Sequence, residues 1–407
     1  MDEAQHGGAV DAGLGERRVE GVVCVRTERC VEACVNHEEG VDEELRSSPR
    51  AEHRGASPPE NERKQRDVET ADVARSDDEK PHGATLPQLI FEAPRLTETR
   101  PRKILATSSC RGEMLRKDET LRLRDGRALA YAEYGDRNGC PVMLFHGNPS
   151  SRLSWGLIPN SPFRPHLRLI APDRPGFGRS DFQPGRQLLD WPNDVCELAD
   201  ALGLNRFTVL GVSGGGPATL ACTWKIPERL TAAGVVSSPC PTDVAGVTEK
   251  MSRTNRTLFF LTQHAPPLVR LNMAFLAYLA RRDRLVERLV YKMANVDKAM
   301  VERPEIREYL AMGFAEALRQ GGAGSAHELV INHGRPWGFA LEDIHIGVHL
   351  WQGEEDPSVP PAMGRYLAQT IPNCKATFIP GAGHLWIVDH VGEVLDALVA
   401  TREDRAE

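Results

Sequence analysis

The sequence predicts an α/β protein with a mostly parallel central sheet flanked by helices. Short apolar runs alternate with helical stretches over residues 114–242 and again over 341–407. Strands that alternate with helices form parallel sheets covered on both faces. Between the two ranges, residues 243–340 have helical periodicity and almost no strand signal, which predicts an inserted helical cap.

The individual elements follow in order along the chain. Alternating segments on either side of Asp125-Gly126 predict an initial hairpin with strands at 120–123 and 128–133. Further strands are expected at 141–145, 167–172, 207–212, 230–236, 344–352 and 375–379. Helices are expected at 188–202 (regular from Pro192), 216–225, 362–371 and 391–400, and within the cap at 257–280 (interrupted by Pro266 and Pro267), 281–293 and 306–320.

Charge divides the chain near residue 114. The net charge is 50 − 57 = −7, and residues 1–113 carry all of it, with 17 basic and 24 acidic side chains. They also hold Phe91 alone of the 24 aromatic residues, so we expect a disordered tail that cannot bury enough apolar surface to fold. Met114 directly precedes the first hairpin and is a candidate alternative start of translation.

The composition also excludes several classes of protein. Residues 114–407 hold 33 basic and 33 acidic side chains, so no electrostatic footprint for nucleic acid is expected. The longest uncharged stretch, 207–224, contains four glycines and Pro217, and is not expected to span a membrane. The first twenty residues lack the apolar run of a secretory signal, and nine cysteines are too sparse for a disulfide scaffold, so a cytoplasmic protein is expected.

The strongest chemical signal is the segment Gly211-Val212-Ser213-Gly214-Gly215. It lies between an expected strand and an expected helix, as a Gly-x-Ser-x-Gly turn requires. Such a turn holds the serine oxygen at the carboxyl end of the sheet, where open α/β sheets bind ligands. Ser213 is therefore a candidate nucleophile, and the backbone N–H of Gly214 at the helix N-terminus is a candidate oxyanion donor.

A nucleophilic serine needs a histidine base and an acid that orients it. Loops after the last two strands supply Asp356 and then His384, in the chain order typical of such sheets. Alternative acids are Glu354 and Glu355 beside Asp356, and Asp243 after an earlier strand. His390 is expected at a helix start, and His345 and His349 in or beside a strand, so none of the three is favoured as the base or as part of a metal pair.

The loop after the strand at 141–145 is the candidate second half of the oxyanion site. It reads His146-Gly147-Asn148-Pro149, and the backbone N–H of Asn148 is the expected donor. We expect structural roles for His146 and for Asp173 in the next loop. A pocket formed by the cap could be lined by aromatic and Met residues that could equally belong to the core: Trp155, Phe259, Phe260, Met273, Phe275, Trp337 and Phe339.

Together these motifs resemble the α/β-hydrolase superfamily over essentially all of residues 114–407. The loops at 146–149, 173–180, 353–356 and 381–384 follow the family's order, and Gly211–Pro217 is similar to a branch of cofactor-independent serine hydrolases. The resemblance implies an α/β-hydrolase fold, a helical cap and hydrolysis of a small ester-like substrate by a monomer or homodimer without cofactor. Haloalkane dehalogenases and epoxide hydrolases use an aspartate nucleophile, which Ser213 does not match. Proline iminopeptidases typically carry Trp where this chain has Gly214.

Other interpretations stay open beside the serine hydrolase. The same fold could serve as a non-catalytic ligand-binding protein, and the same triad could support C–C bond hydrolysis or perhydrolysis. A zinc site at Cys24, Cys30, Cys34 and His37 is disfavoured because the paired Cys-x-x-Cys spacing is missing. A basic helix face with Arg281, Arg282, Arg284 and Arg288 is interpreted as a solvated helix rather than a membrane-surface lid.

Overall fold

A computed structural model describes residues 117–157, 166–281 and 297–403. The chain divides into the units Met1–Pro101 and Arg102–Glu407, and every described residue belongs to the second. The expectations for the tail, for Met114 and for the cysteines and histidine at 24–37 therefore lie outside the described residues. So does most of the expected helix at 281–293.

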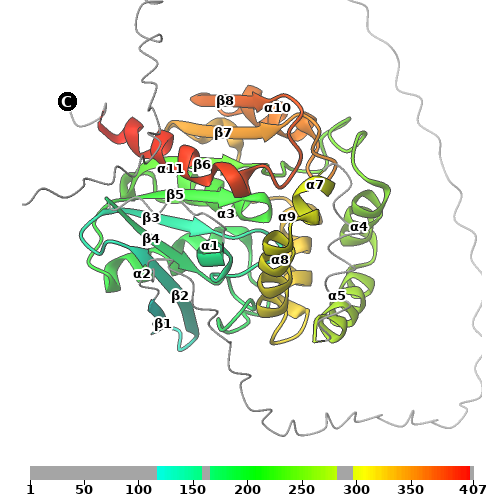
Figure 1. Cartoon of the computed structure of the whole chain (residues 1–407), viewed down its shortest axis with the longest axis horizontal. Coiled ribbons are helices and arrows are strands. Elements are labelled where there is room, and N and C mark those ends of the chain that lie inside the picture. Colours follow the sequence, from blue (N-terminus) through cyan, green and yellow to red (C-terminus); the bar gives the residue numbers. More distant parts are fainter. Residues whose placement is uncertain (1–116, 158–165, 282–296, 404–407) are drawn as a thin grey trace, which may run out of the picture. The chain divides into compact units, whose positions relative to one another are not determined.

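An eight-stranded sheet forms the centre of the molecule, in the order β1-β2-β4-β3-β5-β6-β7-β8 (Figure 1). The strands are β1 (Lys117–Arg122), β2 (Ala128–Gly135), β3 (Cys140–Phe145), β4 (Leu167–Pro172), β5 (Phe207–Val212), β6 (Leu230–Val236), β7 (Val348–Gly353) and β8 (Cys374–Ile379). β2 is antiparallel to both β1 and β4, and all other neighbours are parallel. The predicted fold class is therefore confirmed.

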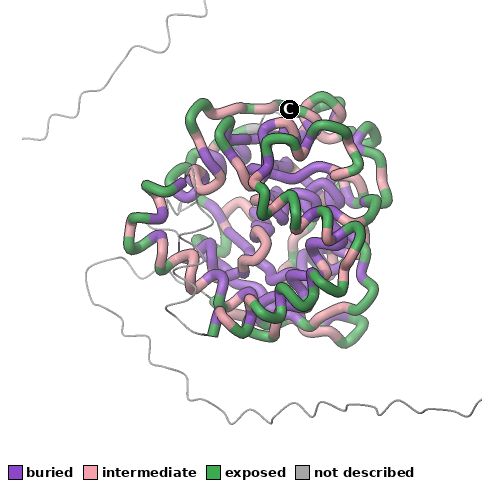
Figure 2. Tube along the Cα trace, turned by 90° about the vertical axis from the view of Figure 1, so that its right-hand side faces the viewer, coloured by how far each residue is buried: buried purple, intermediate pink, exposed green. Residues whose placement is uncertain are grey.

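Helices cover both faces of this sheet. They are α1 (Ser154–Leu157), α2 (Trp191–Ala201), α3 (Gly216–Lys225), α10 (Pro361–Thr370) and α11 (Ile387–Glu403), with 3-10 turns η1 (Leu188–Asp190), η2 (Ser213–Gly215), η3 (Pro227–Arg229) and η4 (Leu341–Asp343). One apolar core joins α2, α3 and α10 to the sheet, and a second joins α1 and α11 to its other face. Figure 2 shows the buried strands enclosed by helices whose outer sides are exposed.

A block of helices lies between β6 and β7 in the sequence. Its described helices are α4 (Arg253–His264), α5 (Pro266–Ala280), α7 (Lys298–Glu302), α8 (Pro304–Ala317) and α9 (Ala323–His333). We call them the helical insertion. They lie beside the ends of the strands in Figure 1, and α9 contacts η2 directly. None of the described helices is long and apolar enough to cross a membrane.

Most expected elements coincide with observed ones, but one expected strand starts later, and the helices α1, α7 and α9 were not expected. The strand expected from Ile344 begins only at Val348, and residues 344–347, which follow the turn η4, form neither helix nor strand. Helix α9 was not expected. Its sequence contains Gly324, Ser325 and β-branched residues, which have low helix propensity, so contacts with the rest of the protein determine its conformation.

Candidate active site

Ser213 sits at the carboxyl end of β5, in the turn that leads through η2 into α3. Its φ angle of 53° lies in the left-handed region of backbone conformation, which residues other than glycine rarely adopt. A Cβ atom on Gly211 would lie 2.2 Å from Thr219 Oγ1, and one on Gly215 would lie 2.3 Å from the Phe145 carbonyl oxygen. Only glycine fits at these two positions, so the motif's glycines allow the tight turn that presents the serine.

Ser213, His384 and Asp356 are brought together from three separate loops. His384 Nε2 lies 3.1 Å from Ser213 Oγ, and His384 Nδ1 lies 2.7 Å from Asp356 Oδ2. Asp356 is buried, and its Oδ1 accepts the backbone N–H groups of Ser358 at 2.8 Å and Val359 at 2.9 Å. These bonds fix the carboxylate, which in turn orients the imidazole so that Nε2 faces the serine.

The rival side chains lie elsewhere. Glu354 and Glu355 are exposed, and Glu354 forms an ion pair with Arg365 at 2.9 Å. Asp243 is also exposed. His390 is paired with Glu393 on the surface of α11 at 3.1 Å. Of the acids weighed from the sequence, the structure therefore brings Asp356 to His384. Among the described residues no cluster of His, Cys, Asp or Glu could hold a metal ion.

Asp297, at the start of α7, is a site residue that the sequence did not reveal. It is buried, and its Oδ2 accepts the backbone N–H of His384 at 2.8 Å. A Cβ atom on Gly383 would lie 2.1 Å from Asp297 Oδ1, so the Gly-x-Gly-His loop needs glycine there to admit the carboxylate. No local pattern marks Asp297, because only the fold brings this segment of the insertion to the histidine loop.

The two carboxylates control the charge on His384. Burial by itself would lower the pKa of His384, but the charge and hydrogen bond of Asp356 and the charge of Asp297 outweigh it, and the pKa lies above its ordinary value. Burial also raises the pKa of Asp297, against the hydrogen bonds donated by the Leu385 and His384 backbone. The arrangement stabilises an imidazolium, which is what a base that accepts a serine proton becomes.

The loop after β3 lies against the serine. A Cβ atom on Gly147 would be 3.4 Å from Ser213 Cβ, and one on Gly214 would be 3.3 Å from the backbone nitrogen of Asn148. The two N–H groups expected to bind an oxyanion are thus close neighbours. The Asn148 side chain is held by α9, since its Nδ2 donates to the Ser325 carbonyl at 3.1 Å and its Oδ1 accepts from Ser325 Oγ at 2.6 Å.

A buried ion cluster supports this loop from behind. Arg174 Nε donates to Glu328 Oε1 at 3.0 Å, and its two other nitrogens donate to the carbonyl groups of His146 and Gly147. Arg186 binds the other oxygen of Glu328. Burial would raise the pKa of Glu328, but the two guanidinium groups hold it below its ordinary value. Glu328 lies on α9, so the insertion supplies the counter-ion for an arginine of the core.

His146 and Asp173 make only structural contacts, in agreement with their expected roles. His146 Nε2 accepts the backbone N–H of Arg174 at 3.1 Å, which leaves the proton on Nδ1, 2.8 Å from the Gly147 carbonyl. Burial holds the pKa of His146 well below its ordinary value. Asp173 accepts from the backbone and guanidinium of Arg152 at 2.6 and 2.7 Å. Both side chains brace the loops around the site.

The residues suggested as pocket liners separate into buried or stacked side chains and exposed ones. Trp155 and Trp337 are buried in the two cores, Phe339 stacks on Trp224, and Phe259 stacks on His333 at 3.6 Å. The Met273 sulfur faces inward, 3.4 Å from Ser325 Oγ.

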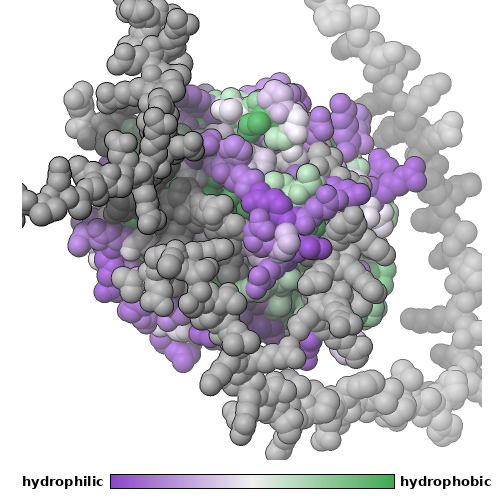
Figure 3. Space-filling model, viewed as in Figure 1, coloured by the Kyte–Doolittle hydropathy of each residue, from purple (hydrophilic) through white to green (hydrophobic). Residues whose placement is uncertain are grey.

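The prediction is corrected for Phe260 and Phe275. They are 58% and 57% exposed, because Phe275 lies on the face of α5 opposite Met273 and Phe260 lies on the outer side of α4. Apolar side chains reach the surface along this edge of the molecule (Figure 3).

The strand order and the strained serine turn define an α/β hydrolase. A model of the Alpha/beta hydrolase family matches residues 142–397, and the chain belongs to this family. The family assigns hydrolysis to the protein as its class of activity.

The proteins that the chain is similar to have names that refer to different reactions. The chain is 28% identical over 260 residues to a 2-hydroxymuconate semialdehyde hydrolase from Pseudomonas putida. This alignment covers 62% of this chain and 83% of that protein. The chain is 35% identical over 125 residues to a non-heme chloroperoxidase from Streptomyces lividans. This alignment covers 30% of this chain and 45% of the relative's length. A solved thermophilic esterase from Thermogutta terrifontis shares the fold, with a TM-score of 0.51, 23% identity and coverage of 70% and 97% of the two chains.

Proposed function

We propose that the protein is a serine hydrolase that cleaves a small ester-like substrate through an acyl-enzyme. The observation that carries the proposal is the continuous hydrogen-bonded series from Ser213 Oγ through His384 to Asp356, with distances of 3.1 and 2.7 Å. A serine hydroxyl is a weak nucleophile until a positioned base accepts its proton. The left-handed backbone at Ser213 supports the same interpretation, because strain of this kind is concentrated at functional sites.

The reaction proceeds in two halves. Ser213 Oγ bonds to the carbonyl carbon while its proton passes to His384 Nε2, and the N–H groups of Asn148 and Gly214 stabilise the oxyanion. The bond to the leaving alkoxide then breaks as His384 returns the proton to it. A water molecule attacks the acyl-enzyme with His384 again as base, and the carboxylate product leaves with Ser213 restored.

Hydrolysis of a C–C bond is a second candidate. The similarity to the 2-hydroxymuconate semialdehyde hydrolase, over 83% of that protein, favours it. The two reactions differ in the group that His384 must protonate, an alkoxide oxygen in the first and a carbanion or enol in the second. Products from a β-diketone compared with those from an ester of the same acyl group distinguish them. Peracid formed from acetate and peroxide would indicate perhydrolysis instead.

Labelling with a fluorophosphonate tests the proposal most directly. The wild type is expected to react covalently at Ser213, and the Ser213→Ala variant is expected to stay unlabelled. Chromogenic esters of increasing acyl length then measure turnover in both proteins. Ser150→Ala is a matched serine control. It removes a hydroxyl that lies 2.7 Å from Ser154 Oγ, and this variant should still be labelled at Ser213.

Two results would contradict the proposal. One is equal labelling of wild type and Ser213→Ala. The other is ligand-induced thermal stabilisation by esters that are never turned over, which would identify a non-catalytic binding protein on this fold.

A further inference from the structure

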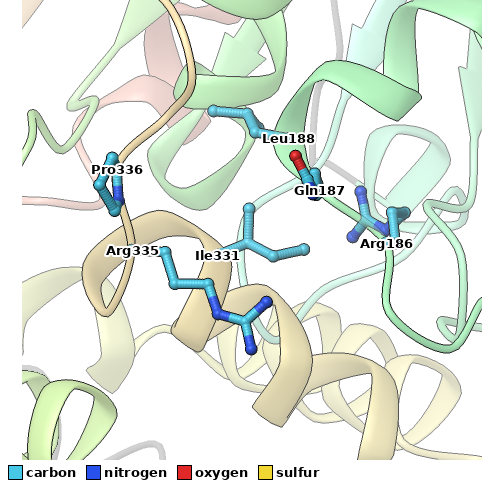
Figure 4. A pocket seen from close by; sticks show the side chains of 6 residues that line it. All are labelled: Arg186, Gln187, Leu188, Ile331, Arg335 and Pro336. Atoms are coloured by element: carbon cyan, nitrogen blue, oxygen red, sulfur yellow. The ribbon is translucent and has the colours of Figure 1, made fainter.

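A cavity of about 230 Å³ opens between the loop before η1 and the end of α9. Its described lining consists of Arg186, Gln187, Leu188, Ile331, Arg335 and Pro336. Figure 4 shows Arg186 and Arg335 on either side of Ile331. A water molecule takes about 30 Å³ in the liquid, so the cavity has room for a molecule of several heavy atoms. Two of its described lining residues are cations, and none is an acid.

Arg186 has more donors than the described residues satisfy. The side chain is 1% exposed, and among these residues its Nη2 alone has a hydrogen-bond partner, Glu328 Oε2. Nε and Nη1 are buried without a hydrogen-bond partner among the described residues. Leaving buried donors of a charged group without partners is costly, so the position favours a ligand that accepts hydrogen bonds.

Two buried arginines share one carboxylate. Arg174 and Arg186 share the single carboxylate of Glu328, and the remaining nitrogens of Arg174 bind neutral carbonyl groups. Asp194 also interacts with Arg186, but its two oxygens are bound by Arg127 at 2.6 and 2.8 Å. Asp173 also attracts Arg174, and it is bound by Arg152 at 2.7 Å. Among the described residues, Glu328 is thus the one carboxylate that forms an ion pair with Arg174 or Arg186. Arg335, exposed at the rim, adds a further positive charge.

We propose that this cavity binds a small carboxylate with a short apolar chain, at a site separate from Ser213. The planar fork of a guanidinium matches a carboxylate through two parallel hydrogen bonds. Leu188, Ile331 and Pro336 supply an apolar wall for the chain. The ligand's charge would complete the pairing of Arg186, and Arg335 would approach it from the solvent side.

Helix α9 separates this site from the serine. Ser325 and Asn332 lie on the side of α9 that faces the oxyanion loop. The Ser325 carbonyl accepts from Asn148 Nδ2, and Asn332 Nδ2 donates to the Gly214 carbonyl at 3.1 Å. Ile331 lies in the last turn of α9 and Arg335 lies two residues beyond the helix, and both border the cavity. The proposal therefore concerns a second ligand site and does not depend on the proposed reaction.

Binding of butyrate tests the proposal. Isothermal titration at constant ionic strength, with chloride as the reference anion, is expected to show saturable binding to the wild type. Acetate should bind more weakly, because it lacks the chain that contacts the apolar wall. The Arg186→Gln and Arg335→Gln variants should each weaken butyrate binding at least tenfold. Arg256→Gln, which removes an exposed arginine of α4, is the matched control and should bind as the wild type does.

The outcomes separate the alternatives. Arg335 is exposed, so its variant is expected to fold even if Arg186→Gln does not, and thermal unfolding verifies this. No binding of butyrate to the wild type, or binding that both variants retain, would overturn the proposal. Saturable binding of inorganic phosphate at the same arginines, without binding of butyrate, would overturn the assignment to a carboxylate.

Discussion

Replacing Glu328 with Gln should destabilise the protein strongly while keeping the shape of the side chain. Glu328 is fully buried and is the shared counter-ion of Arg174 and Arg186, which are 0% and 1% exposed. Breaking a buried ion pair on one side typically costs about 3–5 kcal/mol, because the partner's charge stays buried and uncompensated. Since domains are stable by only about 5–15 kcal/mol, the loss is a large part of the total.

Urea unfolding followed by circular dichroism measures this loss. A fall in melting temperature on the order of 10 °C should accompany it, at about 2–4 °C per kcal/mol for a domain of this size. The control is Asp389→Asn, which breaks a surface pair with Arg303 at 2.8 Å and should cost less than about 1 kcal/mol. A loss of under about 1 kcal/mol in Glu328→Gln would show that the cluster is compensated in another way, and would refute the reasoning.

Three further changes test the site and its surroundings. Asp297→Asn should lower kcat/KM about tenfold, as expected for losing a hydrogen bond to a charged group. It should also move the acid limb of the pH profile to lower pH, because Asp297 helps to raise the pKa of His384; an unmoved limb would contradict this. Gly211→Ala should lower the free energy of unfolding by about 1–3 kcal/mol in urea, since its Cβ would lie 2.2 Å from Thr219 Oγ1. Burial lowers the pKa of His333 to about 3. The free energy of unfolding of the wild type should therefore fall, relative to that of His333→Gln, by up to about 1.4 kcal/mol per pH unit as the pH drops below about 6.5. Parallel curves of unfolding free energy against pH for the two proteins would exclude this.

The parts of the fold that the sequence predicted best are those whose signals are local. Strands β4, β5 and β6 are short, mostly apolar segments ended by turn residues, and their bounds coincide with the expected ranges. Ser213, Asp356 and His384 each stand at a strand end within a loop motif, so chain order was enough to propose their meeting. Asp297 and Glu328 could not be found this way, because each reaches its partner only through the packing of the insertion on the sheet.

The same limit explains the incorrect pocket assignments. Phe260 and Phe275 were chosen by residue type, without knowing which side of α4 and α5 faces the sheet. Both helices carry apolar residues around much of their circumference, so periodicity alone did not separate the inner from the outer face.

The contacts of α9 bear on how such enzymes can be altered. Through Ser325, Glu328 and Asn332 this one helix binds the Asn148 side chain, forms an ion pair with Arg174 and donates to the Gly214 carbonyl. The helical insertion is therefore not an exchangeable module. A chimera that takes its insertion from a relative would need to retain α9 with this chain's core, and could vary α4 and α5 far more freely.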